Sequence, residues 1–466
     1  MSASTGIQQL VERALALSEA DDCIVIAEER TEANLRWAGN SLTTNGQMHS
    51  TKMVVISIIR TDDGQASGVV SGPVSLAGAD DELPALVRAS EAAARSAGPA
   101  EDAAPLIQPY DTDDDWDAPA ARTSIEVFAD FAPALGSAFE QATSDDVLLY
   151  GFAEHIVTSV FLASSTGLRR RFDQPSGRLE VNAKSADLTR SAWTGRHTRD
   201  FRDIDVPELT ADLNRRLGWA ENRIDLPAGR YETLLPPTAV ADLMVYLYWT
   251  ASARDAGEGR SVFSAKGGGD RIGDRLAELP LTLYSDPNEP GLECPPFQIT
   301  PVSHDESAFD NGAPGELTKW IDGGVLTNLY RSRSTAASNG GEHRQYIDNL
   351  VLTAPEATKS LDEMIASTER GLLITCLWYI RTVDPQTLLL TGLTRDGVYL
   401  IENGEVRGVV NNFRFNESPV DLLSRVSEVG ATVPTLPREW SDNFTRAAMP
   451  VLRVPDFNMS TVSQAS

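Results

Sequence analysis

The densest group of chemically active side chains in the sequence is the triplet His304-Asp305-Glu306. An imidazole beside two carboxylates could bind a divalent metal or transfer a proton. Proline, serine and asparagine residues flank the triplet, which is the composition of an exposed loop. The sequence therefore favours a solvated loop, and the triplet is a candidate site only if the chain is a hydrolase on its own.

The cysteines offer one further candidate nucleophile. Cys294 lies in the loop-like segment Glu293-Cys-Pro-Pro, where a thiol could pair with a distant histidine. An unreactive loop thiol is the favoured interpretation. Cys376 lies in the apolar run 372–380, which predicts a buried core position. The sequence contains neither a G-x-S-x-G nucleophile elbow nor a glycine-rich phosphate-binding motif.

Metal and redox chemistry have little support in the sequence. There are five histidines and three cysteines. No two histidines are close enough to form a local zinc motif, and there is no CxxC pair. Cysteines this far apart are typical of a reducing cytoplasm without a disulfide framework. We therefore expect no metal and no bound cofactor in this chain.

The net charge of −27, from 40 Lys and Arg against 67 Asp and Glu, narrows the class of partner. A chain this acidic repels phosphate backbones and anionic lipids, so we expect no nucleic acid and no membrane among its partners. The N-terminal segment lacks the basic and apolar regions of a signal peptide. The longest apolar stretches, 234–253 and 371–380, are too interrupted or too short to span a bilayer. We expect a cytoplasmic protein.

The first half of the chain predicts helices packed on antiparallel strands. Apolar spacing predicts helices over 5–18, 82–96, 123–142 and 209–217. Predicted turns lie at Asn45-Gly46 and Asp62-Asp63-Gly64, and predicted strands at 23–29, 32–38, 49–60, 66–71, 147–155, 156–164, 168–172 and 178–185. Residues 101–117 contain seven acids and no Lys or Arg, so the segment near 98–120 predicts an acidic linker. We assign residues 1–225 to an N-terminal domain of a sheet and helices.

From residue 226 the pattern indicates a β-rich domain. A strand at 231–235 precedes an apolar helix that is predicted to run from Pro237 to Ala253. Two similar hairpins follow, with turns at 322–324 and 402–404, where Asp-Gly and Asn-Gly supply the positive φ angles of tight turns. The predicted fold class is therefore α+β in two domains, with residues 226–466 forming a mainly antiparallel β domain.

Several segments, taken in order, resemble landmarks of the TldD/PmbA family, whose members are also called modulators of DNA gyrase. The resemblance spans nearly the whole chain and rests on the order and spacing of its segments. These segments are Leu226-Pro-Ala-Gly229, Ser261-Val-Phe-Ser264, Leu281-Thr-Leu-Tyr-Ser-Asp286-Pro, Phe309-Asp310-Asn-Gly312-Ala-Pro314, Trp320-Ile-Asp-Gly-Gly324, Gly371-Leu-Leu-Ile-Thr375 and Leu400-Ile-Glu402-Asn-Gly404.

The resemblance implies a zinc metallopeptidase assembly. A TldD-type subunit carries H-E-x-x-x-H on the helix that opens the C-terminal domain, and a cysteine is a further ligand. Zinc held in this way activates a water molecule while the glutamate takes its proton. In this chain the corresponding helix, Val240 to Arg254, has no His and no Glu, and there is no histidine between His197 and His304.

The resemblance therefore implies a TldE/PmbA-like subunit, a pseudoenzyme that is inactive alone and shapes the cavity in which proteolysis of unfolded peptides takes place. Its expected partners are a TldD-like subunit, which would hold the zinc in a heterodimer, and an extended peptide. Two alternatives remain open. One is a peptide-binding protein that associates with itself as a homodimer. The other is an autonomous hydrolase that uses His304, Asp305, Glu306 and Cys294.

Overall fold

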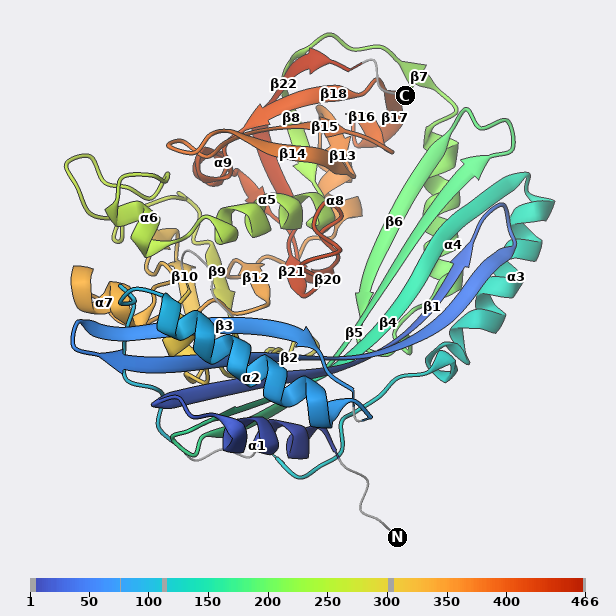
Figure 1. Ribbon diagram of the computed structural model, residues 1–466. Coiled ribbons are helices and arrows are strands. Elements are labelled where there is room, and N and C mark those ends of the chain that lie inside the picture. The colour runs from blue at the N-terminus through green and yellow to red at the C-terminus, as the bar shows by residue number, and fades with distance from the viewer. Residues whose placement is uncertain (1–5, 76, 111–114, 301–305, 464–466) are drawn as a thin grey trace.

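The computed structural model describes residues 6–75, 77–110, 115–300 and 306–463. Within these residues the strands form three sheets, one from the N-terminal part of the chain and two from the part after residue 222. Figure 1 shows the N-terminal sheet curving around one side of the two C-terminal sheets.

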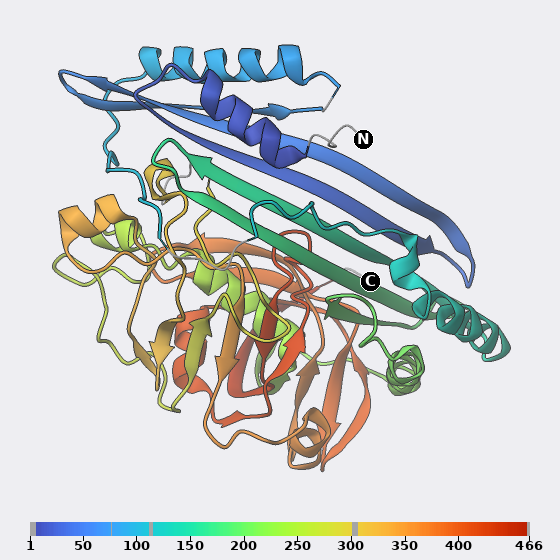
Figure 2. The same ribbon diagram turned by 90° about the horizontal axis from the view of Figure 1, so that it is seen from below.

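The N-terminal sheet has the strand order β3-β2-β1-β4-β5-β6, and each neighbouring pair is antiparallel. Figure 2 shows its long strands lying across the C-terminal half. The strands are Asp22–Trp37 (β1), Leu42–Thr61 (β2), Gly64–Pro73 (β3), Val147–Ser164 (β4), Arg169–Ser185 (β5) and Ser191–Thr198 (β6).

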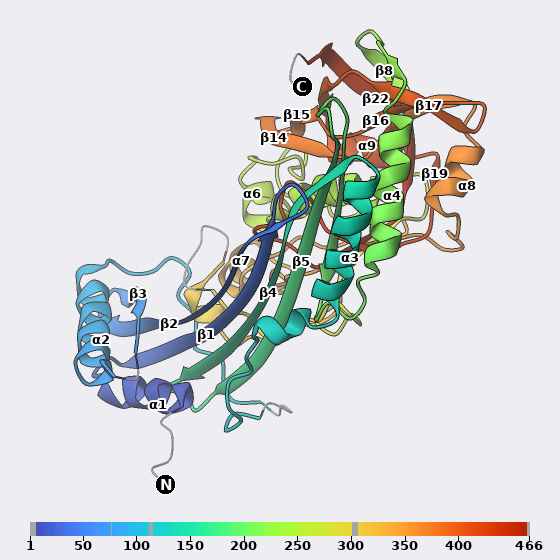
Figure 3. The same ribbon diagram turned by 90° about the vertical axis from the view of Figure 1, so that its right-hand side faces the viewer.

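Alternation along β1 explains how this sheet is covered. Side chains such as Val25 and Leu35 lie on one face, under the helices, whereas Ile24 lies on the other face and packs with Phe309 of the C-terminal half. Figure 3 shows α3 and α4 side by side on the outer face. The covering elements are the helices Ile7–Leu17 (α1), Ala79–Ser96 (α2), Phe131–Ser144 (α3) and Val206–Trp219 (α4), with a 3-10 helix at Ile125–Phe128 (η1).

The C-terminal half holds two mixed sheets. One has the order β11-β10-β9-β12-β21-β20, with strands Thr282–Ser285 (β9), Thr318–Asp322 (β10), Val325–Leu326 (β11), Leu350–Thr353 (β12), Val433–Thr435 (β20) and Ala447–Met449 (β21). The other has the order β14-β15-β18-β22-β8-β13-β16-β17-β7, with β19 paired to β22. Its strands are Arg223–Ile224 (β7), Gly229–Leu235 (β8), Arg370–Ile374 (β13), Leu377–Asp384 (β14), Leu389–Thr394 (β15), Val398–Glu402 (β16), Glu405–Val410 (β17), Phe413–Glu417 (β18), Glu428–Val429 (β19) and Leu452–Val462 (β22).

Helix α5 (Pro237–Trp249) lies between these two sheets (Figure 1). Its sequence is apolar on every side, which is typical of a helix enclosed by other elements. It begins with Pro237, whose fixed φ suits a first helical position. The shorter helices are Ala253–Gly257 (α6), Ala308–Asp310 (η2, a 3-10 helix), Arg333–Asn339 (α7), Leu361–Ala366 (α8) and Pro419–Arg425 (α9). None of the helices in the described residues is long and apolar enough to cross a membrane.

The predicted α+β class is confirmed, and so is the mainly antiparallel character of the C-terminal half, where three strand pairs are parallel. Both predicted hairpins form, as β10–β11 and β16–β17, with positive φ at Gly324 and Gly404. The helices predicted near 5–18, 82–96 and 209–217 are α1, α2 and α4.

Six predictions about individual elements are wrong. The strand pairs 23–29 with 32–38, 147–155 with 156–164, and 168–172 with 178–185 are single strands, β1, β4 and β5. Asn45-Gly46 is no turn, because both residues pair with β1 inside β2. The helix predicted from 123 begins at Phe131, after Ser124 has capped η1. The helix predicted to reach Ala253 ends at Trp249, where Ser252 forms a bridge to Tyr330 and caps α6.

Candidate functional site

The candidate catalytic residues of the sequence do not come together in the described structure. His304 and Asp305 lie outside the described residues, and Glu306 is partly exposed. Cys294 lies in a loop, as predicted, but it is fully buried, and this burial raises its pKa to about 12. A thiol that stays protonated at neutral pH is a poor nucleophile.

The other two cysteines are also buried. Burial raises the pKa of Cys23 to about 11 and that of Cys376 to about 12. Cys376 follows β13 and is buried, as its apolar surroundings in the sequence predicted.

The burial of all three thiols predicts a simple labelling result. The native chain is expected to react with a thiol reagent at neutral pH at least about tenfold more slowly than the denatured chain, because only the thiolate reacts and burial suppresses it. Absorbance of the released chromophore counts the thiols, and the denatured chain, in which all three should react at once, is the control. One thiol that labels rapidly in the native chain would restore Cys294 as a candidate nucleophile.

Helix α5 is the element that the resemblance singles out, and Asp242 is its only acidic or basic side chain. Asp242 is fully buried. One carboxylate oxygen, Oδ1, accepts a hydrogen bond from the backbone N–H of Glu439 at 2.9 Å, and Oδ2 has no partner among the described residues. Burial raises the pKa of Asp242 well above its ordinary value.

The segment after β20 covers this side of α5. Trp440 donates its indole N–H to the backbone carbonyl of Asp242 at 2.8 Å. Its ring packs against Tyr246 and Trp249 of α5, with centroids 5.4 and 5.1 Å apart. Glu439 accepts hydrogen bonds from the backbone N–H groups of Tyr379 and Ile380 in β14, at 3.1 and 3.0 Å. Trp440 and Glu439 therefore occupy the space beside Asp242 on α5.

Arg438 is a cation next to Glu439 and Trp440, the residues that cover α5. It donates hydrogen bonds to the thiol of Cys376 and, at 3.1 Å, to the carboxylate of Asp396. Its guanidinium lies 4.7 Å from the ring centres of both Trp193 and Trp378, within reach of cation–π attraction. We call Arg438, Cys376, Asp396 and the two tryptophans the Arg438 cluster. Since Trp193 belongs to β6, the cluster joins the N-terminal sheet to the C-terminal half.

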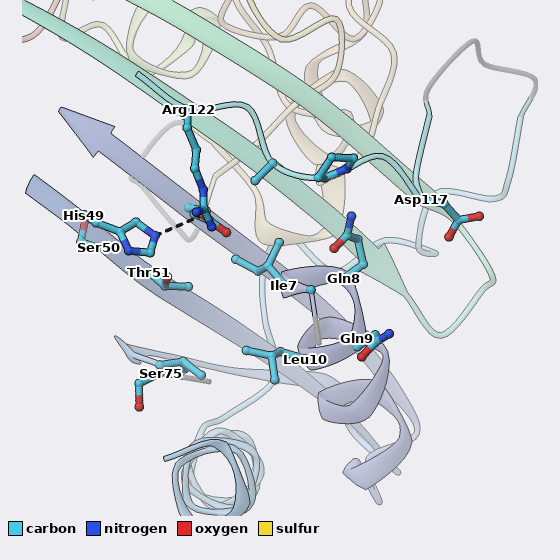
Figure 4. Close-up of a pocket in the computed structure, with 15 residues that line it drawn as sticks. Ile7, Gln8, Gln9, Leu10, His49, Ser50, Thr51, Ser75, Asp117 and Arg122 are labelled. Carbon is cyan, nitrogen blue, oxygen red and sulfur yellow. Dashed lines mark hydrogen bonds and ion pairs between the residues drawn. The ribbon is translucent and has the colours of Figure 1, made fainter. Parts of the chain in front are cut away.

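A separate cavity of about 750 Å³ lies beside α1. Figure 4 shows His49 and Arg122 among the residues that line it. Glu29 accepts hydrogen bonds from Arg122 at 2.6 and 2.9 Å and lies 3.2 Å from Nε2 of His49. Its carboxylate is therefore already engaged. Among the described residues, His49 has no hydrogen bond to a serine, threonine or cysteine, the pairing that activates a nucleophile in many hydrolases.

Comparisons with known proteins identify the family. A family profile described as the PmbA/TldA metallopeptidase C-terminal domain matches residues 228–461, half of the chain. The chain therefore belongs to the PmbA/TldD family. A search of curated proteins gave no significant match.

Three solved structures are similar over the whole chain. They are TldE from Thermococcus kodakarensis (16% identity, TM-score 0.77, 97% of this chain and 99% of that one), the protein TM0727 from Thermotoga maritima (18%, 0.77, 97% and 99%) and BT3649 from Bacteroides thetaiotaomicron (14%, 0.71, 98% and 99%). The last two are described as modulators of DNA gyrase. At these identities the likeness shows that the fold is shared.

The residues beside α5 do not fit the zinc site that the family resemblance implies. A catalytic zinc needs three protein ligands, usually with histidine among them. Asp242 is the one carboxylate on the helix, and Cys376 already accepts a hydrogen bond from a cation, Arg438. In the part of the chain that the structure describes, no three His, Cys, Asp or Glu side chains gather in a way that could hold a metal ion.

Sequence reasoning missed the Arg438 cluster. Its members lie at 193, 376, 378, 396 and 438, on segments that no short motif connects. The absence of His and Glu from α5 could be read from the sequence once the resemblance had located the helix. What replaces them depends on how distant segments pack, which no local pattern signals.

Proposed function

We propose that this chain is the non-catalytic, TldE-like subunit of a PmbA/TldD-type metallopeptidase, which acts on unfolded peptides together with a zinc-bearing H-E-x-x-x-H subunit. The observation that carries the proposal is the state of α5. Its only acidic or basic side chain, Asp242, is buried, Trp440 packs against this part of the helix, and a nearby cation is Arg438. We also propose a cytoplasmic location, which the three free and buried cysteines support.

A reconstitution experiment tests the proposal. The chain is co-expressed with a candidate H-E-x-x-x-H subunit, and each protein and the complex are assayed for cleavage of an unfolded peptide. We expect the two chains to co-purify, the complex to cleave, and this chain alone to be inactive. Cleavage by this chain alone, abolished by a chelator, would refute the proposal.

The outer half of β2 could position an extended peptide. Residues 42–50 pair with β1 on one side, and β3 pairs with β2 only from Lys52 onward. In the described residues this stretch has no strand on its other side, and Leu42 and Met48 are more than half exposed. The stretch carries no Lys, Arg or Pro, the residues that commonly block an open edge. An extended peptide can add to such an edge through main-chain hydrogen bonds.

A charged edge should weaken this contact. The double variant Leu42→Lys/Met48→Lys is expected to lower partner-dependent cleavage of an unfolded peptide severalfold, since lysines on an edge oppose strand addition. The initial rate of cleavage by the complex measures the effect. Leu188→Lys, an equally exposed leucine in the β5–β6 connection, is the matched control and should cleave as the wild type does. Equal rates for the wild type, the double variant and the control would show that the peptide does not bind at this edge.

The same open edge favours one alternative, a peptide-binding protein that associates with itself through β2. Light scattering of the purified chain separates the two. A dimer that the double lysine variant converts to monomer, and that ignores an H-E-x-x-x-H subunit, supports self-association. The autonomous hydrolase, with its candidates His304, Asp305, Glu306 and Cys294, gains no support from the described residues.

A further inference from the structure

A cavity of about 430 Å³ lies between the N-terminal sheet and the C-terminal half. Residues 193–196 of β6 and 433–435 of β20 form two of its walls, and the start of α5 and the segment 358–361 form the others. Each of these two strands is the last in its sheet. The volume lies within the range of small-molecule sites in proteins.

The charge of the lining differs from the charge of the chain. Three basic residues line the cavity, Arg196, Arg216 and Lys359, and no acidic residue does. The whole chain has 67 acids against 40 bases. Two of the three bases are already paired, because Arg216 lies 2.7 Å from the carboxylate of Asp212 and Lys359 contacts Glu428.

Arg196 is the one of these three bases that forms no ion pair with a carboxylate in the described residues. Its Nη1 donates to the hydroxyl of Thr194 and the carbonyl of Gly195, both at 3.0 Å, which fixes the side chain along β6. It makes no ion pair with any acid in the described residues. Burial, and then the nearby Arg216, lower its pKa, although Asp212 and Glu208 act in the opposite direction. An arginine remains charged in such surroundings, and its planar guanidinium suits an anion with two oxygens.

The rest of the lining is mixed. Its apolar part includes Trp193, Pro236, Pro237, Leu361, Val433 and Val451, and six threonine and serine residues lie among them: Thr194, Thr238, Thr358, Ser360, Thr375 and Thr435. A ligand that suits both the guanidinium of Arg196 and the apolar residues of the lining has an apolar body and one anionic end. We propose that this cavity binds a carboxylate with an apolar body, with the carboxylate on Arg196. The carboxylate has two sources, the C-terminus of an apolar peptide or a free small carboxylic acid. The proposal holds whether or not the chain belongs to a peptidase complex.

Calorimetric titration of the full-length chain tests the proposal. The probes are N-acetyl-leucyl-leucine, its C-terminal amide and octanoate. We expect at least one of the two acids to bind, and the amide to bind at least about tenfold more weakly than the dipeptide acid if that acid is the one that binds. Binding of the dipeptide acid alone identifies a peptide end, and binding of octanoate identifies a free acid. No binding of either acid at millimolar concentration, or equal binding of the dipeptide acid and its amide, would overturn the proposal.

Three variants complete the test. Arg196→Gln is expected to weaken binding of the acid at least about tenfold, because it removes the charge and keeps polarity. Arg202→Gln is the matched control, since its side chain is 83% exposed and lies outside the cavity, and it should bind as the wild type does. Val433→Trp fills the cavity from an exposed position and should abolish binding even if Arg196→Gln fails to fold. Unchanged binding in a folded Arg196→Gln, or in Val433→Trp, would contradict the assignment.

Discussion

Replacing Arg438 with methionine is expected to lower the free energy of unfolding by about 3 to 5 kcal/mol, the range observed when one partner of a buried ion pair is removed. The side chain of Arg438 is 9% exposed and that of Asp396 is 15% exposed. Methionine keeps the length of the side chain but removes the closer cation of Asp396, which retains only the more distant Arg395 at 3.9 Å. It also removes the guanidinium from between Trp193 and Trp378. Chemical denaturation of the purified chain, followed by circular dichroism, measures the loss.

Two further variants separate the causes. Arg438→Lys keeps the charge but loses the planar fork, so we expect a smaller destabilisation than with methionine. Arg407→Met removes an exposed arginine that pairs with Glu405 at 2.7 Å, and should cost less than about 1 kcal/mol. A loss below about 1 kcal/mol for Arg438→Met would mean that the cluster does not hold this part of the fold together.

The second large effect concerns Asp242 and pH. Because burial raises its pKa in the folded chain, the folded state keeps this proton at pH values where the unfolded chain, with a pKa of about 3.9, has released it. The folded state therefore binds more protons, and stability falls as pH rises between the two pKa values. The slope from this group reaches about 1.4 kcal/mol per pH unit. The contribution of Asp242 to the free energy of unfolding is therefore greatest at low pH, and it is lost as the pH rises through the pKa of this group in the folded state.

Asp242→Asn should remove this slope while keeping an oxygen for the N–H group of Glu439. Free energies of unfolding at pH values from about 5.5 to 8, above the sequence pI of about 4.6, give the comparison. We expect the variant to gain stability relative to the wild type as the pH increases. Asp225→Asn, at an 86% exposed side chain, is the control and should change stability by less than about 0.5 kcal/mol. A difference between Asp242→Asn and wild type that stays constant with pH would contradict the buried, protonated carboxyl.

The elements that the sequence predicted well are those with a strong local signal. The apolar stripe of α1 and the Asn403-Gly404 turn each depend on a few neighbouring residues. The long strands were divided because polar residues inside them resemble turns. At Asn45-Gly46 the turn preference is overridden by pairing with Leu35 and Asn34 of β1, a tertiary effect that strand propensity does not contain.

In the candidate site, too, local features could be predicted from the sequence and tertiary contacts could not. That α5 lacks the imidazoles of a zinc helix was evident from residues 240–254 alone. That Trp440 covers the helix and Arg438 supplies the local cation was not, because residues about 200 positions away in the sequence make these contacts. The triplet His304, Asp305 and Glu306 stays a prediction, because His304 and Asp305 lie outside the described residues.

In the proposed assembly, this chain carries no catalytic zinc and depends on a subunit that does. Zinc content per chain, measured by mass spectrometry on the purified chain, on a purified H-E-x-x-x-H subunit and on their complex, tests it most directly. We expect close to zero zinc in this chain, and one zinc per heterodimer in the complex, carried by the other subunit. One zinc per chain in this protein alone, retained after dialysis, would contradict it.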